Sequence, residues 1–416
     1  MKKIELLAPA GNFSKLKTAF YYGADAVYAG GKNLSLRAFS DNFTDDEMIA
    51  AVNYAHDLGK KVYVTVNVFA RNADIKRAEE YFKFLEKIGA DAAIVTDPGL
   101  ICLSKKVAPD LELHLSTQAN TLNYESAKFW VDLGVKRVIL ARELSFKEIK
   151  EINDCLPETA ETECFVHGAM CISYSGRCLL SNYLNGRDGN RGECVQACRW
   201  NWEMREKNKQ GEYISLCEDE RGTYVLNSKD LNMIDYIGNF VDSGVSSLKI
   251  EGRMKSEYYL ATVINAYRRA IDAYYRIGDK YAENPQFAGE LKKTCHRAFT
   301  TAYMLNRENG ETVNYKNSQS QGEAEFIAAV TGYDEKRGVA EIEMRNRFKA
   351  GETLEVLSPG ENFNKKIVIA GLKNEAGEEV TDAKLVQQKL YFKPPFKLSA
   401  GDMLRRELPL ERPERI

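Results

Sequence analysis

Short apolar segments alternate with helical patterns through the first part of the chain. Apolar runs bounded by turn residues are typical of buried strands, and apolar positions at a spacing of three and four residues indicate amphipathic helices. The alternation predicts eight strands, at Ile4 to Leu7, Asp25 to Tyr28, Lys61 to Phe69, Ala92 to Val95, Glu112 to Leu115, Arg137 to Leu140, Glu163 to Val166 and Ser247 to Ile250.

The repetition of strand and helix favours a parallel sheet and an α/β fold class. Eight units favour a closed (β/α)8 barrel of the TIM type, in which the carboxyl ends of the strands carry the active site. Similar small turns, such as Gly23-Ala24-Asp25 and Gly89-Ala90-Asp91, precede successive strands. An open doubly wound sheet is the alternative, but no G-x-G-x-x-G motif follows the first strand.

The pattern changes after the eighth strand. Glu257 to Ile277 is a strongly periodic helix, and the polar residues 314–322 are typical of a linker. From Glu323 onwards apolar and polar residues alternate, which indicates strands. We therefore expect a barrel over residues 1–313, with a cysteine-rich insertion at about 171–223, and a small all-β barrel domain over residues 323–416.

Composition limits the classes of function. The chain has 416 residues, of which 44% are hydrophobic and 28% charged, so a large core is expected. A net charge of -2 excludes a globally basic nucleic-acid binder, although a local basic patch remains compatible with it. The amino terminus lacks the apolar stretch of a signal peptide, and no run is long enough to span a membrane. We expect a cytoplasmic protein without membrane contact.

Four cysteines form the densest chemical feature: Cys171, Cys178, Cys194 and Cys198. In a reducing compartment, clustered cysteines indicate metal binding or catalysis more often than disulfides. Four thiolates can hold either zinc or a [4Fe-4S] cluster. Only Cys194 and Cys198 have the tight spacing of a zinc knuckle, and apolar neighbours suit a cluster, so we favour iron and sulfur. Four incidental cysteines are the alternative.

Polar side chains follow several predicted strands, at the end where a barrel gathers its active site. Arginine pairs suit an anionic substrate, because a guanidinium binds carboxylate or phosphate through two hydrogen bonds. The alternatives are structural ion pairs between Arg142 and Glu143 or between Glu251 and Arg253, and a hydrogen-bonded structural role for His167. The candidate catalytic residues are Asn67, Gln118, Arg142, His167, Glu251 and Arg253.

The stretch from Glu163 to Cys171, followed by Gly176, Cys178, Leu180 and Ser181, resembles the signature of the collagenase-like peptidase family (unknown-mechanism class U, family 32). The resemblance covers nearly the whole chain. Further matching segments are Leu6 to Gly11, Ser116 to Gln118, Asn227 to Leu231, Lys249 to Lys255, Arg345 to Phe348 and Gly351-Glu352. Neither H-E-x-x-H nor G-x-S-x-G is present, so the signatures of zinc proteases and serine hydrolases are missing.

The resemblance implies an oxygen-independent hydroxylation protein that binds a [4Fe-4S] cluster. A barrel followed by one β domain is most similar to the tRNA type, which converts wobble uridine to 5-hydroxyuridine with prephenate as co-substrate. Cys171, Cys178, Cys194 and Cys198 fall on the family's cluster-ligand pattern, and the two carboxylates of prephenate suit Arg142 and Arg253. Alternatives within the family are a collagenase-like peptidase and a non-catalytic subunit that works with a shorter family member in a hetero-oligomer.

Overall fold

The computed structural model describes residues 3–32, 34–35, 42–191, 193–199, 218–219, 222–223, 228–305 and 321–409. Most of the second half of the predicted insertion and most of the predicted linker, 314–320, lie outside the described residues. No helix in the described part of the chain has both the length and the apolar character needed to cross a bilayer.

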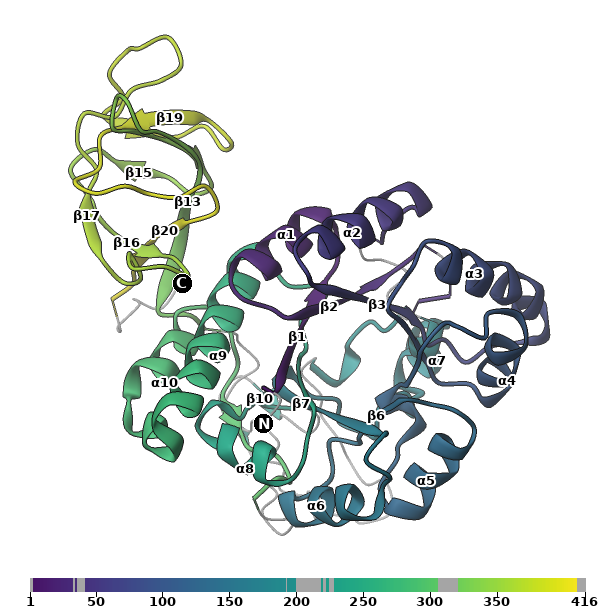
Figure 1. Ribbon diagram of the computed structural model, residues 1–416. Helices are drawn as coiled ribbons and strands as arrows, with labels where there is room; N and C mark the ends of the chain where they lie inside the picture. The colour runs from purple at the N-terminus through teal and green to yellow at the C-terminus, as the bar shows by residue number, and fades with distance from the viewer. Residues whose placement is uncertain are drawn as a thin grey trace.

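Eight parallel strands of the described residues form the closed barrel that the sequence predicts (Figure 1). The eighth strand pairs with both the first and the seventh, with Ser247 opposite Glu5 on one side and opposite Glu163 on the other. The strands are β1 (Glu5–Ala10), β2 (Ala26–Gly30), β3 (Lys61–Val66), β4 (Ala92–Val95), β5 (Leu113–Leu115), β6 (Arg137–Ile139), β7 (Glu161–Ala169) and β11 (Ser247–Ile250).

Helices surround the barrel, and polar caps fix where several of them begin. The side chain of Asn12 accepts a hydrogen bond from the Lys15 amide at the start of α1, and Thr44 and Ser145 form capping boxes for α2 and α6. The helices are α1 (Phe13–Tyr21), α2 (Asp45–Asp57), α3 (Ile75–Lys87), α4 (Pro98–Val107), α5 (Tyr124–Asp132), α6 (Phe146–Cys155), α8 (Ile237–Asp242), α9 (Glu257–Ile277) and α10 (Pro285–Lys292).

Several short elements follow β7 in the chain. The strand β10 (Asp230–Asn232), which the sequence pattern did not predict, pairs antiparallel with the end of β7 and parallel with β12 (Phe299–Thr300). A short helix, α7 (Leu180–Asn185), and a two-stranded sheet of β8 (Glu218–Asp219) and β9 (Gly222–Thr223) lie within the predicted insertion.

A network of charged side chains fills the amino-terminal end of the barrel interior. The Arg137 guanidinium lies 2.6 Å from carboxylate oxygens of both Glu5 and Glu161 and 3.1 Å from Glu163. The Lys249 ammonium lies 2.8 Å from Glu163, whose side chain is fully buried. Because buried charges need partners, this network is stable only when the four strands that supply it are assembled.

The predicted carboxyl-terminal all-β domain is confirmed. Six strands form one antiparallel sheet in the order β17-β16-β20-β13-β14-β19, and two short strands pair separately. The domain has its own core of buried aliphatic and aromatic side chains. The strands are β13 (Ala324–Asp334), β14 (Val339–Met344), β15 (Phe348–Lys349), β16 (Thr353–Leu357), β17 (Lys366–Val368), β18 (Asp382–Ala383), β19 (Lys389–Phe392) and β20 (Met403–Glu407).

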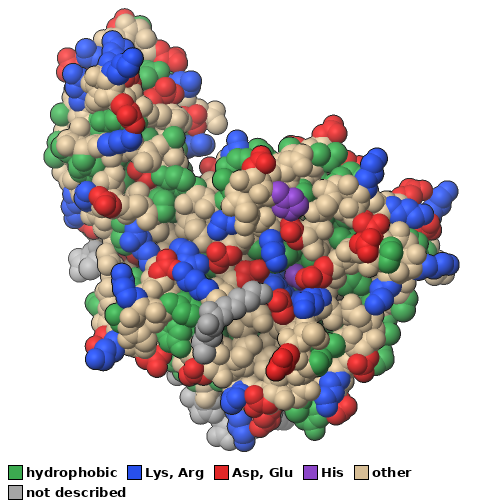
Figure 2. All heavy atoms as spheres, in the orientation of Figure 1, with side chains coloured by type: hydrophobic (Ala, Val, Ile, Leu, Met, Phe, Trp, Pro, Cys, Tyr) green, Lys and Arg blue, Asp and Glu red, His purple; other side chains and the backbone are tan. Residues whose placement is uncertain are grey.

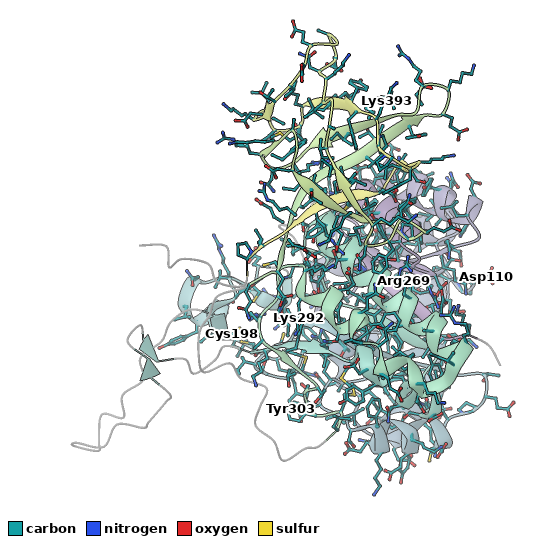
Figure 3. The ribbon with its side chains drawn as sticks, turned by 90° about the vertical axis from the view of Figure 1, so that its left-hand side faces the viewer. Asp110, Cys198, Arg269, Lys292, Tyr303 and Lys393 are labelled. Carbon is teal, nitrogen blue, oxygen red and sulfur yellow. The ribbon has the colours of Figure 1, made fainter. Side chains whose placement is uncertain are left out.

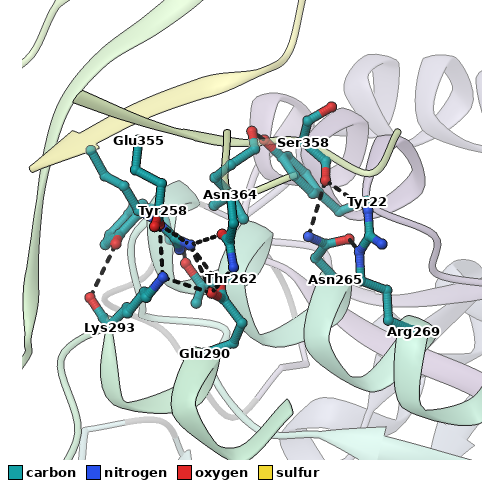
Figure 4. Close-up of polar contacts among 12 residues, drawn as sticks. Tyr22, Tyr258, Thr262, Asn265, Arg269, Glu290, Lys293, Glu355, Ser358 and Asn364 are labelled. Atoms are coloured by element: carbon teal, nitrogen blue, oxygen red, sulfur yellow. Dashed lines mark hydrogen bonds and ion pairs between the residues drawn. The ribbon is translucent and has the colours of Figure 1, made fainter. Parts of the chain in front are cut away.

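Buried polar contacts join the β domain to α9 and α10 (Figure 4). The Arg405 side chain on β20 is 0% exposed; it donates to Glu355 at 2.6 Å and to both carboxylate oxygens of Glu290 at 2.8 Å. Lys293 adds ion pairs to the same two carboxylates. Arg269 of α9 donates to the Ser358 and Pro359 carbonyls. The two domains therefore share one network of charges.

Basic and acidic side chains are interspersed over both domains on the face shown in Figure 2. That distribution agrees with the near-zero net charge of the chain.

Candidate functional site

A cavity of about 180 Å³ lies at the carboxyl ends of the barrel strands. Strand residues such as Thr65, Ile94 and Phe165 form its inner wall, and residues 171–191 and 193–199, here called the cysteine segment, contribute to its outer wall. Figure 3 shows Cys198 and Asp110 at opposite sides of the barrel. Asp110 lies three residues before β5 begins and so marks the amino-terminal face of the barrel. The cysteine segment therefore lies at the carboxyl face, where barrel enzymes carry their active sites.

The outer wall approaches the inner wall closely at Gly176. This residue has a φ of +77°, and a Cβ atom there would lie 2.9 Å from Nε2 of Gln118. A side chain at position 176 would therefore be strained and would also push the cysteine segment away from the strand ends.

Three of the four clustered cysteines line the cavity: Cys171, Cys178 and Cys194. The Leu180 amide donates to the Cys178 sulfur at 3.5 Å, and the Gln196 amide donates to the Cys194 sulfur at 3.4 Å. Such N–H donors stabilise thiolates and the metal centres that they hold.

Cys198 is partly exposed and is not among the residues that line the cavity. Within the described residues, no three His, Cys, Asp or Glu side chains are grouped closely enough to hold one metal ion. A shared four-cysteine site therefore stays a prediction.

Arg142 and Arg253 both line the cavity, from loops that follow β6 and β11. The Arg142 guanidinium donates to the Ala169 carbonyl at 2.8 Å and lies 3.9 Å from the centre of the Phe165 ring. Arg253 donates to the hydroxyls of Thr65 and Ser35 at 3.0 and 2.8 Å. These contacts hold both guanidinium groups at the cavity.

Asn67, Gln118 and Glu251 also line the cavity, as the sequence predicts for residues that follow β3, β5 and β11. The Asn67 Oδ1 atom is buried and has no hydrogen-bond partner among the described residues, so it can accept a bond from a ligand. Gln118 accepts a bond from Thr96 at 3.4 Å, and Glu251 accepts one from the Tyr28 hydroxyl at 3.4 Å.

Lys249 is a cavity residue that our sequence analysis did not select. Burial lowers the pKa of its ammonium group in spite of Glu163, and the amine lies 4.5 Å from the centre of the Tyr28 ring. Burial also opposes the ionisation of Glu163, but Lys249 and Arg137 outweigh it, so the pKa of Glu163 lies below its ordinary value. The feature of the sequence that could have indicated it is a lysine between the apolar residues Leu248 and Ile250 of a predicted strand.

His167 does not line the cavity, because β7 contains a bulge. Phe165 is opposite Lys249, whereas the next aligned pair is His167 and Ile250, so β7 has one extra residue there. An extra residue reverses the alternation of side chains along a strand. The imidazole therefore packs against Tyr259 and Tyr267 of α9, with ring centres 6.1 and 5.5 Å away.

Burial lowers the pKa of His167 to about 3, so the ring is neutral in the folded protein near pH 7. The unfolded chain protonates this histidine below about pH 6.5, and the folded state does not, so stability falls as the pH drops through that value. Between pH 7 and pH 5, we expect the unaltered protein to lose about 2 kcal/mol more unfolding free energy than His167→Gln does. Urea unfolding at both pH values checks this; an equal loss in both proteins would contradict it.

Two family models together match most of the chain. The model described as "Peptidase family U32" matches residues 11–314, and the model described as "Peptidase family U32 C-terminal domain" matches residues 322–405. The two matches correspond to the barrel and to the β domain of the structure.

Several curated relatives align over most of their length. The "tRNA hydroxylation protein P1" of Bacillus subtilis (strain 168) is 39% identical, with 97% of this chain and 95% of the relative covered. The "tRNA hydroxylation protein P" of Escherichia coli (strain K12) is 38% identical, with 91% of each chain covered. A "Collagenase" of Porphyromonas gingivalis (strain ATCC BAA-308 / W83) is 30% identical, with 85% and 86% covered. With both of its domains matched, this chain belongs to peptidase family U32.

Proposed function

We propose that this protein is a tRNA-modifying enzyme that hydroxylates the wobble uridine to 5-hydroxyuridine, with prephenate as co-substrate and with a [4Fe-4S] cluster. The observation that carries the proposal is the cavity at the carboxyl end of the barrel, whose wall contains three cysteines and two arginines. The full-length similarity to two tRNA hydroxylation proteins supports tRNA as the substrate.

The cysteine segment fits the chemistry of an iron-sulfur site in part. Cys171, Cys178 and Cys194 face one cavity, and backbone amides already donate to two of their sulfurs. We propose these three thiolates as ligands and Cys198, four residues after Cys194, as the fourth. When bound, such a cluster supplies one-electron redox chemistry. The protein's own contribution is to hold the thiolates and to limit water around them with Phe165 and Ile139.

The cationic side chains of the cavity suit a dicarboxylate. Arg142 and Arg253 come from different strand ends, so each can bind one carboxylate of prephenate. The Lys249 amine and the free Asn67 oxygen add a donor and an acceptor near the inner wall. The protein thus binds and orients the co-substrate while the polar groups of the strand ends replace water around it.

The proposal is tested with protein purified without oxygen and incubated with unmodified tRNA, with and without prephenate. We expect visible absorption, about four irons per chain and 5-hydroxyuridine only when prephenate is present, measured by mass spectrometry of the nucleosides. Cluster-loaded protein that forms no 5-hydroxyuridine would overturn the proposed activity.

Arg142→Gln is expected to raise the KM for prephenate about 10- to 150-fold, because a charge-assisted hydrogen bond contributes about 1.5–3 kcal/mol. Glutamine is uncharged and shorter than arginine, so the variant removes the guanidinium group and keeps a polar side chain. Lys147→Gln, which removes an exposed cation outside the cavity lining, is the matched control and should leave this KM unchanged. Equal KM values for Arg142→Gln and the unaltered protein would remove Arg142 from the co-substrate site.

A collagenase-like peptidase is the second candidate, which the name of the Porphyromonas gingivalis relative favours. His167 is buried against aromatic rings, so it is not placed to move protons at the cavity. Incubation of the same protein with gelatin and a collagen peptide decides between the two. Cleavage that persists in Cys171→Ala would support the peptidase. A hetero-oligomer with a shorter family member, in which this chain is non-catalytic, stays a prediction.

A further inference from the structure

Large apolar side chains are exposed next to the cavity. Tyr174 lies between two lining residues, Ser173 and Ser175, and Leu179 directly follows Cys178. Tyr183 lies two residues after Ser181 on α7 and is 86% exposed, and Met254 directly follows Arg253. We call Tyr174, Leu179, Tyr183 and Met254 the apolar rim. A concentration of exposed apolar side chains around polar groups is typical of a binding surface.

The surroundings of the apolar rim include several guanidinium groups. Arg177 is exposed between Tyr174 and Leu179, and its guanidinium lies 5.6 Å from the centre of the Phe69 ring. Arg71, in the loop after β3, lies 3.7 Å from Asp188 of the cysteine segment. Exposed tyrosine rings beside arginines are the combination that proteins use for unpaired nucleotides, because rings stack on bases and guanidinium groups bind phosphates.

We propose that the apolar rim is a stacking surface for unpaired nucleotides on either side of the target uridine. The inference rests on the proposed function and assigns to the tRNA a contact surface outside the cavity. A base can enter a cavity of about 180 Å³ only when it leaves the stack of its neighbours. The neighbours then need new stacking partners, and Tyr183 and Tyr174 lie within two residues of the cavity wall to supply them.

The test measures binding of unmodified tRNA to the full-length protein by fluorescence anisotropy. We expect Tyr183→Ala to weaken binding about 5- to 150-fold, the effect of losing one stacked base, and Tyr183→Phe to bind within about twofold of the unaltered protein. Phe129→Ala removes an exposed ring of α5 that does not line the cavity, and it should bind tRNA normally.

Salt dependence separates stacking from charge. Arg177→Gln should reduce the slope of log affinity against log salt concentration by the amount that about one phosphate contact contributes. Tyr183→Ala should leave the slope unchanged. An isolated anticodon stem-loop should compete with tRNA, and a fully paired RNA of equal length should not.

Two outcomes would overturn the inference. The first is unchanged tRNA affinity in Tyr183→Ala while the unaltered protein binds tRNA and hydroxylates it, a result that leaves the proposed function intact. The second is a self-associating protein that Tyr183→Ala converts to a monomer with full tRNA affinity, because the rim would then be a protein interface. If the unaltered protein binds no tRNA at all, the proposed function fails as well.

Discussion

Cys171→Ala is expected to lose its iron and to form 5-hydroxyuridine more than about 100-fold more slowly than the unaltered protein. Loss of a residue that hydrogen-bonds to a metal ligand already lowers metal affinity or activity about 10- to 100-fold. Loss of a ligand itself removes one of the thiolates that hold the centre. The readouts are iron content per chain and nucleoside analysis of tRNA. Because Cys171 is exposed and lines the cavity, alanine leaves no buried gap and the fold should persist.

Cys155→Ala is the matched control, since Cys155 is an exposed cysteine at the end of α6, outside the cavity lining. It should retain both iron and activity. Retained iron in Cys171→Ala would contradict the ligand assignment. Lost iron with normal hydroxylation would assign the metal centre a structural role only.

Arg405→Ala is expected to lower the free energy of unfolding by about 3–5 kcal/mol, because the buried carboxylates of Glu290 and Glu355 lose their guanidinium partner. Arg406→Ala is the matched control on the next residue of β20. Arg406 also has two ion pairs, to Glu325 and Glu352, but its side chain is 32% exposed. Water screens such pairs, so the loss should be below about 1 kcal/mol.

Denaturant unfolding and limited proteolysis measure the difference between the two variants. We expect Arg405→Ala to release the β domain from α10 and to speed proteolytic separation of the two domains. Equal stability of Arg405→Ala and Arg406→Ala would show that the buried network does not hold the domains together.

The barrel could be predicted from the sequence because its signal is local and repeated. Each strand is a short apolar run, and helix α9 was predicted with the bounds that the structure has, Glu257–Ile277. The polar residues after the strands were placed at the cavity because parallel strands end at one face, which holds for Asn67, Gln118 and Arg142.

The remaining features depend on contacts between distant residues. The bulge that turns His167 towards α9 arises from the register in which β7 pairs with β11, and no local pattern in either strand predicts it. Strand β20 contains two successive arginines, Arg405 and Arg406, and such a pair in a sequence resembles an exposed segment. Arg405 is buried only because Glu290 and Glu355 meet it from another helix and another strand.

The closing strand of the barrel has a consequence for synthesis of the chain. Until β11 is made, β1 and β7 are the two free edges of a seven-stranded sheet, and Ser247 is separated from Glu5 by most of the barrel sequence. Free edges invite aggregation of nascent chains. The inward-facing Glu5 and Glu163 place carboxylates at both edges, and before β11 is made the single Arg137 guanidinium is shared among Glu5, Glu161 and Glu163. The remaining negative charge repels a second sheet until Ser247 and Lys249 complete their contacts. The same two glutamates thus protect the unfinished barrel and stabilise the finished one.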